Sequence, residues 1–339
     1  MALPSLRRPG TTFMVLLAGV MLSLIGLRSG PTSSKPEAKT NNIDRQFRFW
    51  YQVKVKEIPS GSKLIRIWLP IPPSNIYQTA SELEVITPIT YRVYQEKEYY
   101  NNILRLEADG ELPDSLVVSV SFNLRRNSYS AWGESGARGA FDTEETLRRY
   151  LSPDRLIPIS GQIKEEAEKV VTKEMSDLEK AKAIYGYVSG NLTYDKSGAG
   201  WGRGDALYAC NALQGNCTDF HSLFIGMARA VGIPARFVMG FPLPPDEIQG
   251  EVSGYHCWAE FYLKGSGWIP VDASEASKFP ELQEFYFGNL DPHRVEFSIG
   301  RDIRLDPALE PLNFFIYPVV VIDDAPFAHV QTLFHFSGN

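Results

Sequence analysis

The chain has 339 residues, of which 44% are hydrophobic and 22% charged, and its formal net charge is −6 at pH 7. This length allows two domains, and the composition is that of an ordinary globular protein. The acidic balance leaves no basic stripe to displace counterions from nucleic acid, so we expect no nucleic-acid partner. The sequence also lacks a phosphate-binding loop and the paired Cys-x-x-Cys of a zinc ribbon, and we predict neither a cofactor nor a metal site.

The N-terminus has the pattern of a targeting segment. Arg7 and Arg8 precede an apolar stretch from Phe13 to Leu27, which is shorter than the roughly 20 residues of a membrane-spanning helix. No A-x-A cleavage site follows it. Residues 1–28 are therefore either a signal peptide that is removed or an N-terminal anchor that attaches the protein to a membrane, and a cytoplasmic chain is the least favoured alternative. We expect an exported protein, periplasmic or extracellular, with a flexible linker at residues 29–46.

Residues 47–127 have the pattern of β-strands. Phe47 to Val55 and Lys63 to Leu69 are rich in aromatic and β-branched residues and end in Pro or Gly turn signals. Leu116 to Leu124 alternates apolar and polar side chains. Short strands without helical periodicity predict a β-sandwich accessory domain, with two further strands at residues 91–94 and 103–106.

Residues 128–339 begin with a Gly/Ser-rich connector at residues 128–139 and continue with helical periodicity. Strand patterns follow Pro234. We therefore predict an α+β catalytic domain that contains helices, then an antiparallel sheet, and finally the C-terminal strands. The predicted helices are residues 163–175, 178–192 and 218–231, and the predicted strands are residues 235–241, 255–263, 268–272 and 314–322.

Cys217 lies where a helix is expected to begin. Asn216 is a favourable N-cap, and Asp219 stands three residues later, where a carboxylate can bond back to the cap. Unpaired N–H groups and the positive end of the helix dipole stabilise a thiolate in the first turn. The same N–H groups can contribute to an oxyanion hole, so Cys217 is the candidate nucleophile.

His256 and Asp272 lie in a predicted hairpin whose turn contains Gly265 and Gly267. A three-residue loop at residues 264–266 places Asp272 across from Trp258 and on the same face as His256, about 7–8 Å away diagonally. A four-residue loop would turn Asp272 to the opposite face. In the first register, Asp272 orients the imidazole of His256 toward Cys217.

Three cysteines are an odd number for an exported protein, so one free thiol is expected. Strand alternation points Cys257 to the face opposite His256, which favours a core residue, and a disulfide between Cys210 and Cys257 is the alternative. For His221, which follows Cys217 by one helical turn, we favour a role in packing or hydrogen bonding over catalysis. A zinc site built from Cys210, Cys217, His221 and Cys257 matches no regular spacing.

The segment from Gly215 to Phe241 resembles the core motif of the transglutaminase-like superfamily. Residues 256–262 and 267–272 resemble its second and third motifs, and residues 47–127 resemble the β-domain that often precedes this core in bacterial members. The resemblance implies a papain-like fold and a catalytic triad of Cys217, His256 and Asp272. The chain departs from the usual pattern at His221 and Cys257, and neither change removes a member of the triad.

Members of this superfamily include cross-linking transglutaminases, thiol peptidases, peptide N-glycanases and inactive scaffolds. We therefore expect a thiol enzyme that forms a thioester on Cys217 from a protein or peptide substrate, with hydrolysis slightly favoured over transamidation. The alternative is a catalytically silent peptide-binding or scaffold module, against which the intact triad argues. The second oxyanion donor stays open among Trp201, Asn211 and Gln214.

Overall fold

The computed structural model describes residues 44–132 and 142–338. The predicted signal peptide or anchor, nearly all of the linker and most of the Gly/Ser-rich connector lie outside these residues. Within the described ranges, no helix has both the length and the apolarity needed to cross a membrane.

One sheet of the β-sandwich has the strand order β11-β18-β1-β6-β3. Its long strand β1 begins at Asp44, so the predicted linker ends three residues earlier than expected. The strands predicted at Phe47 to Val55 and Leu116 to Leu124 are β1 and β6, and they pair antiparallel. The bounds are β1 Asp44–Val55, β3 Gln78–Ile86, β6 Leu116–Asn127, β11 Gln249–Glu251 and β18 Val330–Gly338.

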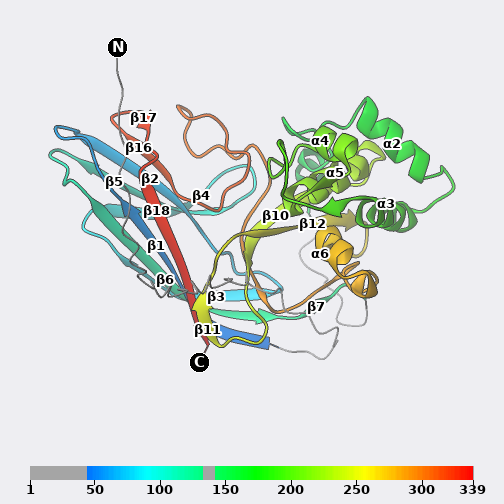
Figure 1. Ribbon diagram of the computed structural model, residues 1–339, viewed down its shortest axis with the longest axis horizontal. Coiled ribbons are helices and arrows are strands. Elements are labelled where there is room, and N and C mark those ends of the chain that lie inside the picture. The colour runs from blue at the N-terminus through cyan, green and yellow to red at the C-terminus, as the bar shows by residue number, and fades with distance from the viewer. Residues whose placement is uncertain (1–43, 133–141, 339) are drawn as a thin grey trace, which may run out of the picture. The chain divides into compact units, whose positions relative to one another are not determined.

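The other sheet of the sandwich has the order β17-β16-β2-β5-β4. The sequence assigns the C-terminal strands to the catalytic domain, but β16 pairs with β2 and β18 pairs with β1. The division at residues 127 and 128 therefore separates strands that belong together, because the sandwich is built from both ends of the described chain (Figure 1). The bounds are β2 Leu64–Ile71, β4 Thr90–Gln95, β5 Asn102–Asp109, β16 Val319–Ile322 and β17 Ala325–Pro326.

The remaining part of the fold is a sheet of order β13-β12-β10-β15 with helices beside it, which confirms the predicted α+β class (Figure 1). Helix α5 packs on this sheet, where Phe224 meets Phe261 with ring centroids 6.3 Å apart. The strands are β10 Ala235–Pro242, β12 His256–Leu263, β13 Gly267–Val271 and β15 Arg294–Ile299. The helices are α1 Glu144–Arg149, α2 Gln162–Val170, α3 Asp177–Asn191, α4 Ala206–Ala212, α5 Cys217–Ala230 and α6 Ala273–Lys278, with a 3-10 turn at Pro280–Leu282. Short pairs are formed by β7 Tyr129–Ser130 with β14 Asn289–Leu290, and by β8 Thr193–Tyr194 with β9 Gln214–Gly215.

An aromatic cluster joins the sandwich to this sheet. Phe49 of β1 stacks with Phe241 of β10 at 5.8 Å between ring centroids and meets Phe297 of β15 at 5.6 Å. Phe334 of β18 lies 4.3 Å from Phe241. Because all these rings are buried in one continuous core, the β-sandwich and the sheet that carries His256 are not independently packed.

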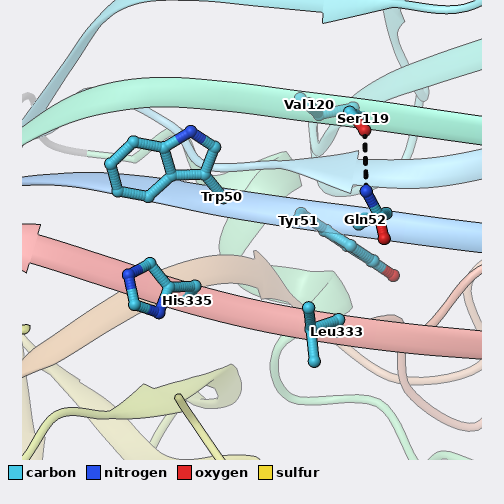
Figure 2. Close-up of a pocket in the computed structure, with 7 residues that line it drawn as sticks. All are labelled: Trp50, Tyr51, Gln52, Ser119, Val120, Leu333 and His335. Atoms are coloured by element: carbon cyan, nitrogen blue, oxygen red, sulfur yellow. Dashed lines mark hydrogen bonds between the residues drawn. The ribbon is translucent and has the colours of Figure 1, made fainter. Parts of the chain in front are cut away.

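The opposite face of the β18-β1-β6 sheet carries a shallow hollow (Figure 2). The rings of Trp50 and His335 lie side by side there, 5.5 Å apart, and Gln52 donates to Ser119 at 3.2 Å. Leu333 at its edge is 48% exposed. Alternation along β1 therefore gives the sheet one face in the core and one face toward solvent.

The shared core predicts that Phe297→Ala destabilises the whole described fold. Truncating a buried aromatic side chain costs about 3–5 kcal/mol, and urea unfolding followed by tryptophan fluorescence measures it. Leu333→Ala, on an exposed position of β18, is the matched control and changes the free energy of unfolding by less than about 1 kcal/mol. Equal effects of the two substitutions would contradict a shared core.

Candidate active site

The first turn of α5 has the capping arrangement that the sequence predicts. The side-chain oxygen of Asn216 accepts a hydrogen bond from the N–H of Thr218 at 2.9 Å, and Asp219 accepts from the N–H of Asn216 at 3.0 Å. Cys217 is the first residue of the helix and is only 2% exposed. The N–H groups of Thr218 and Asp219 are used by the cap residue, whereas that of Cys217 is not. This N–H is therefore available to a ligand beside the thiol.

Asp219 also fixes the glycine-rich loop at residues 198–204. Its carboxylate accepts hydrogen bonds from the N–H groups of Gly202 at 2.6 Å and Gly204 at 2.9 Å. Gly204 has a φ of +62°, and a Cβ there would meet the hydroxyl of Ser222 at 2.8 Å. Only glycine fits this conformation and space without strain, so the loop is anchored directly to the start of α5.

The hairpin of β12 and β13 has the three-residue loop that the sequence predicts. Leu263 pairs with Gly267 and Ala259 with Val271, so Asp272 follows opposite Trp258. The Nε2 atom of His256 lies 2.7 Å from the Oδ2 atom of Asp272, and both residues are buried. The predicted register is confirmed, and it brings the imidazole and the carboxylate into direct contact.

Asp272 receives several further hydrogen bonds. As the N-cap of α6 it accepts from the N–H of Glu275 at 3.0 Å and from the hydroxyl of Ser274 at 2.9 Å. Arg294 of β15 donates to its Oδ2 atom at 3.0 Å. Burial alone would raise the pKa of Asp272, but the charge and hydrogen bond of His256 and the charge of Arg294 hold it well below its usual value. Asp272 is therefore an anion in the folded protein.

Sequence reasoning did not identify Arg294. This side chain also pairs with Asp291 at 2.5 Å and is itself buried, so it neutralises two carboxylates at once. An arginine at the start of a strand with alternating polar and apolar residues is the only sequence signal for it, since its partner Asp272 lies on another element, at the start of α6.

Cys217 and His256 are near enough for each to shift the pKa of the other. Burial would raise the pKa of the Cys217 thiol, but its interactions with Cys257 and His256 and the charge of His256 lower it well below its usual value. Burial would lower the pKa of His256, but Asp272 and Cys217 raise it to about 10. Both shifts favour the ion pair of a thiolate and an imidazolium over the neutral pair. Since Nε2 faces Asp272, the other ring nitrogen is left for the thiol.

Cys257 and His221 lie closer to the candidate nucleophile than the sequence suggests. Cys257 is buried, as expected of a core residue, and its sulfur lies 3.7 Å from the Nδ1 atom of His221. Strand alternation points it away from His256, yet both residues lower the pKa of Cys217. The ring of His221 lies between Cys257 and the N–H of Ala273.

Two other residues that the sequence singled out, Cys210 and Asn211, lie on α4, and no disulfide is formed. Cys210 and Asn211 of α4 both contact Gln162, whose side-chain amide donates to the sulfur of Cys210 at 3.5 Å and to the Oδ1 atom of Asn211 at 2.7 Å. All three cysteines are free thiols, so the Cys210–Cys257 disulfide is not formed. Among the residues that the structure describes, no group of three or more His, Cys, Asp or Glu side chains is arranged to hold a metal ion.

Residues 164–273 match the model of the transglutaminase-like superfamily and include Cys217, His256 and Asp272. The chain therefore contains a transglutaminase-like domain. It is similar to an uncharacterised protein of Haemophilus influenzae, with 28% identity over 351 residues that cover 92% of this chain and 94% of that protein. The uncharacterised protein YebA of Bacillus subtilis is 25% identical over 149 residues, which are 39% of this chain and 20% of YebA.

The fold also matches the crystal structure of a candidate cysteine protease from Cytophaga hutchinsonii. The TM-score is 0.53 at 18% sequence identity, and the match covers 88% of this chain and 100% of that one. The similarity therefore extends over the β-sandwich as well as the transglutaminase-like domain.

Replacing Arg294 by Met is predicted to destabilise the protein by about 3–5 kcal/mol, because it leaves Asp272 and Asp291 buried without their cation. Arg92→Met, at an exposed position of β4, is the control and costs less than about 1 kcal/mol. Both carboxylates have pKa values held below the usual 3.8, so the stability that Arg294 provides is present above that pH. Chemical unfolding at several pH values should show the deficit of Arg294→Met shrinking as the pH falls below about 3.8. A deficit that does not depend on pH would argue against this role.

Proposed function

We propose that the protein is a cysteine-dependent acyl-transfer enzyme that acts on peptide or glutamine amides. Cys217 is the nucleophile, His256 the acid–base group and Asp272 the residue that orients it. The observation that carries this proposal is the buried contact of 2.7 Å between Nε2 of His256 and Oδ2 of Asp272, on an imidazole that lowers the pKa of Cys217 at the start of α5. The match to the transglutaminase-like superfamily supports the same assignment.

The proposed reaction has two steps. In the first, the thiolate of Cys217 forms a bond to the carbonyl carbon of the amide, and the N–H of Cys217 donates to the developing oxyanion. The C–N bond then breaks while the imidazolium of His256 gives its proton to the leaving amine, and a thioester remains. In the second step, His256 takes a proton from water as the water attacks the thioester, the C–S bond breaks and the thiolate is restored.

Water is the acceptor we favour, because hydrolysis needs no binding site for a second protein. Transamidation follows the same first step and differs only in using an amine in the second. Product analysis with and without an added primary amine distinguishes the two acceptors. The apolar N-terminal segment supports export, so we place the protein or peptide substrate outside the cytoplasm.

An activated Cys217 predicts selective alkylation. With a thiol pKa well below 9.0, Cys217 should react with iodoacetamide near pH 6 at least about 100-fold faster than Cys210, whose pKa is raised by burial. Mass spectrometry of the digested protein measures each site, and Cys217→Ala removes the fast reaction. His256→Ala should return the reaction of Cys217 to the pH range of an ordinary thiol. Equal rates at Cys210 and Cys217 would favour the catalytically silent module instead.

The raised pKa of His256 sets the alkaline limit of turnover. The imidazolium is present below a pH of about 10 and is lost as the pH rises through that value, so kcat/KM should fall there. Asp272→Asn removes the main charge that raises this pKa, and the alkaline limit should then move toward the usual 6.5. The pH dependence of kcat/KM on an amide substrate, with folding followed by circular dichroism, tests the shift. An unchanged alkaline limit in Asp272→Asn would exclude Asp272 as the residue that raises the pKa of His256.

A further inference from the structure

The side chain of Asn216 makes hydrogen bonds in two directions. Its Oδ1 atom accepts from the backbone N–H of Thr218 at 2.9 Å, which completes the cap of α5. Since a backbone N–H can only donate, this contact fixes the orientation of the amide and turns the Nδ2 atom the other way. Asn216 is only 3% exposed, so its Nδ2 atom needs a partner within the protein.

That partner is Tyr255. The Nδ2 atom of Asn216 donates to the hydroxyl oxygen of Tyr255 at 3.0 Å. Asn216 directly precedes Cys217, the first residue of α5, and Tyr255 directly precedes His256, the first residue of β12. One hydrogen bond therefore joins the neighbour of the proposed nucleophile to the neighbour of the proposed acid–base group, across 39 positions of the chain.

The residue types at both positions suit this bond. Ser, Thr and Asp also cap helices, but only Asn carries amide N–H donors beside the capping oxygen. Burial raises the pKa of Tyr255, so its hydroxyl stays neutral while it accepts the bond. The ring of Tyr255 packs against Phe314 and Tyr317, with ring centroids 5.7 Å and 6.2 Å away. The hydroxyl is therefore presented to Asn216 by a ring that has its own support.

The bond matters because Cys217 and His256 come from different elements. The pairing of β12 with β10 begins at His256, so Tyr255 precedes the paired part of the strand. Its side chain thus links the start of β12 to the start of α5 without the help of the sheet. In a reaction of this kind, a displacement of about 1 Å between reacting groups can cost about 100-fold in rate.

We propose that the hydrogen bond from Asn216 to Tyr255 holds the thiol of Cys217 in position against the imidazole of His256. Tyr255 is thus a positioning residue, and the inference rests on the proposed roles of Cys217 and His256. Without the bond, the starts of α5 and β12 can move apart, and the charge of His256 then favours the thiolate less. The titratable groups that interact with Cys217 besides His256 are His221 and Asp219 of α5, Cys257 of β12, Tyr194 of β8 and Tyr255 itself.

The test is a double-mutant cycle. Tyr255→Phe removes the acceptor and keeps the ring, whereas Asn216→Ser removes the amide donor and keeps a capping oxygen. Alkylation by iodoacetamide from about pH 4 to about pH 10 gives the midpoint of thiolate formation at Cys217 in both single variants, the double variant and the unmodified protein. Tyr187→Phe is the matched control, because its hydroxyl bonds Glu166 between α3 and α2 at 3.4 Å. Circular dichroism checks the fold, and if one single variant does not fold, the other is compared with the control.

Each single variant should raise the midpoint of Cys217 by about one pH unit, which makes alkylation about tenfold slower below the midpoint. The double variant should show the same shift as either single one, because both substitutions remove one and the same bond. Tyr187→Phe should keep the midpoint of the unmodified protein. In folded variants, an unchanged midpoint, a shift in only one of the two single variants, or shifts that add in the double variant would each overturn the inference. A midpoint near 9.0 in the unmodified protein is a different result, because it contradicts the proposed nucleophile itself.

Discussion

The buried carboxylate of Asp272 is the constraint on which the site depends. A carboxylate without solvent is strongly unfavourable unless hydrogen bonds and cations compensate for its lost hydration. Here His256 and Arg294 supply the positive charge, and the start of α6 supplies further donors. The two carboxylate oxygens of Asp272 therefore connect three elements. Asp272 follows the end of β13, its side chain caps the start of α6, and Arg294 reaches it from β15. The imidazole is held in place by a residue whose own position is fixed from several sides.

The position of the thiol is fixed in a comparable way at the start of α5. Asn216 and Asp219 complete the first turn of α5, and the glycine-rich loop is bonded to that turn. The helix start therefore contributes its partial positive charge to a rigid position. The charge of His256 favours the thiolate further.

The features that sequence reasoning predicted are those set by nearby residues. The capping box of Asn216 and Asp219 spans four positions, and the hairpin register follows from a loop of three residues. The features it missed depend on partners far along the chain. Arg294 reaches Asp272 from another strand, and β18 pairs with β1 across nearly the whole chain. No local pattern records which distant strand a given strand will join.

Cys257 shows the same limit within the site. Alternation correctly places its side chain away from His256, because that rule concerns only neighbours on one strand. Which side chains Cys257 meets outside β12 depends on how α5 packs on the sheet.

The pairing of β1 with β18 also sets an order of events during synthesis. Phe334 of β18 is made after Phe241 of β10 and Tyr51 of β1, yet it packs against both. The aromatic core that joins the sandwich to the sheet of His256 is therefore incomplete until β18 has been made. In the proposed enzyme, the reactivity of the Cys217 thiol develops only after that strand is in place.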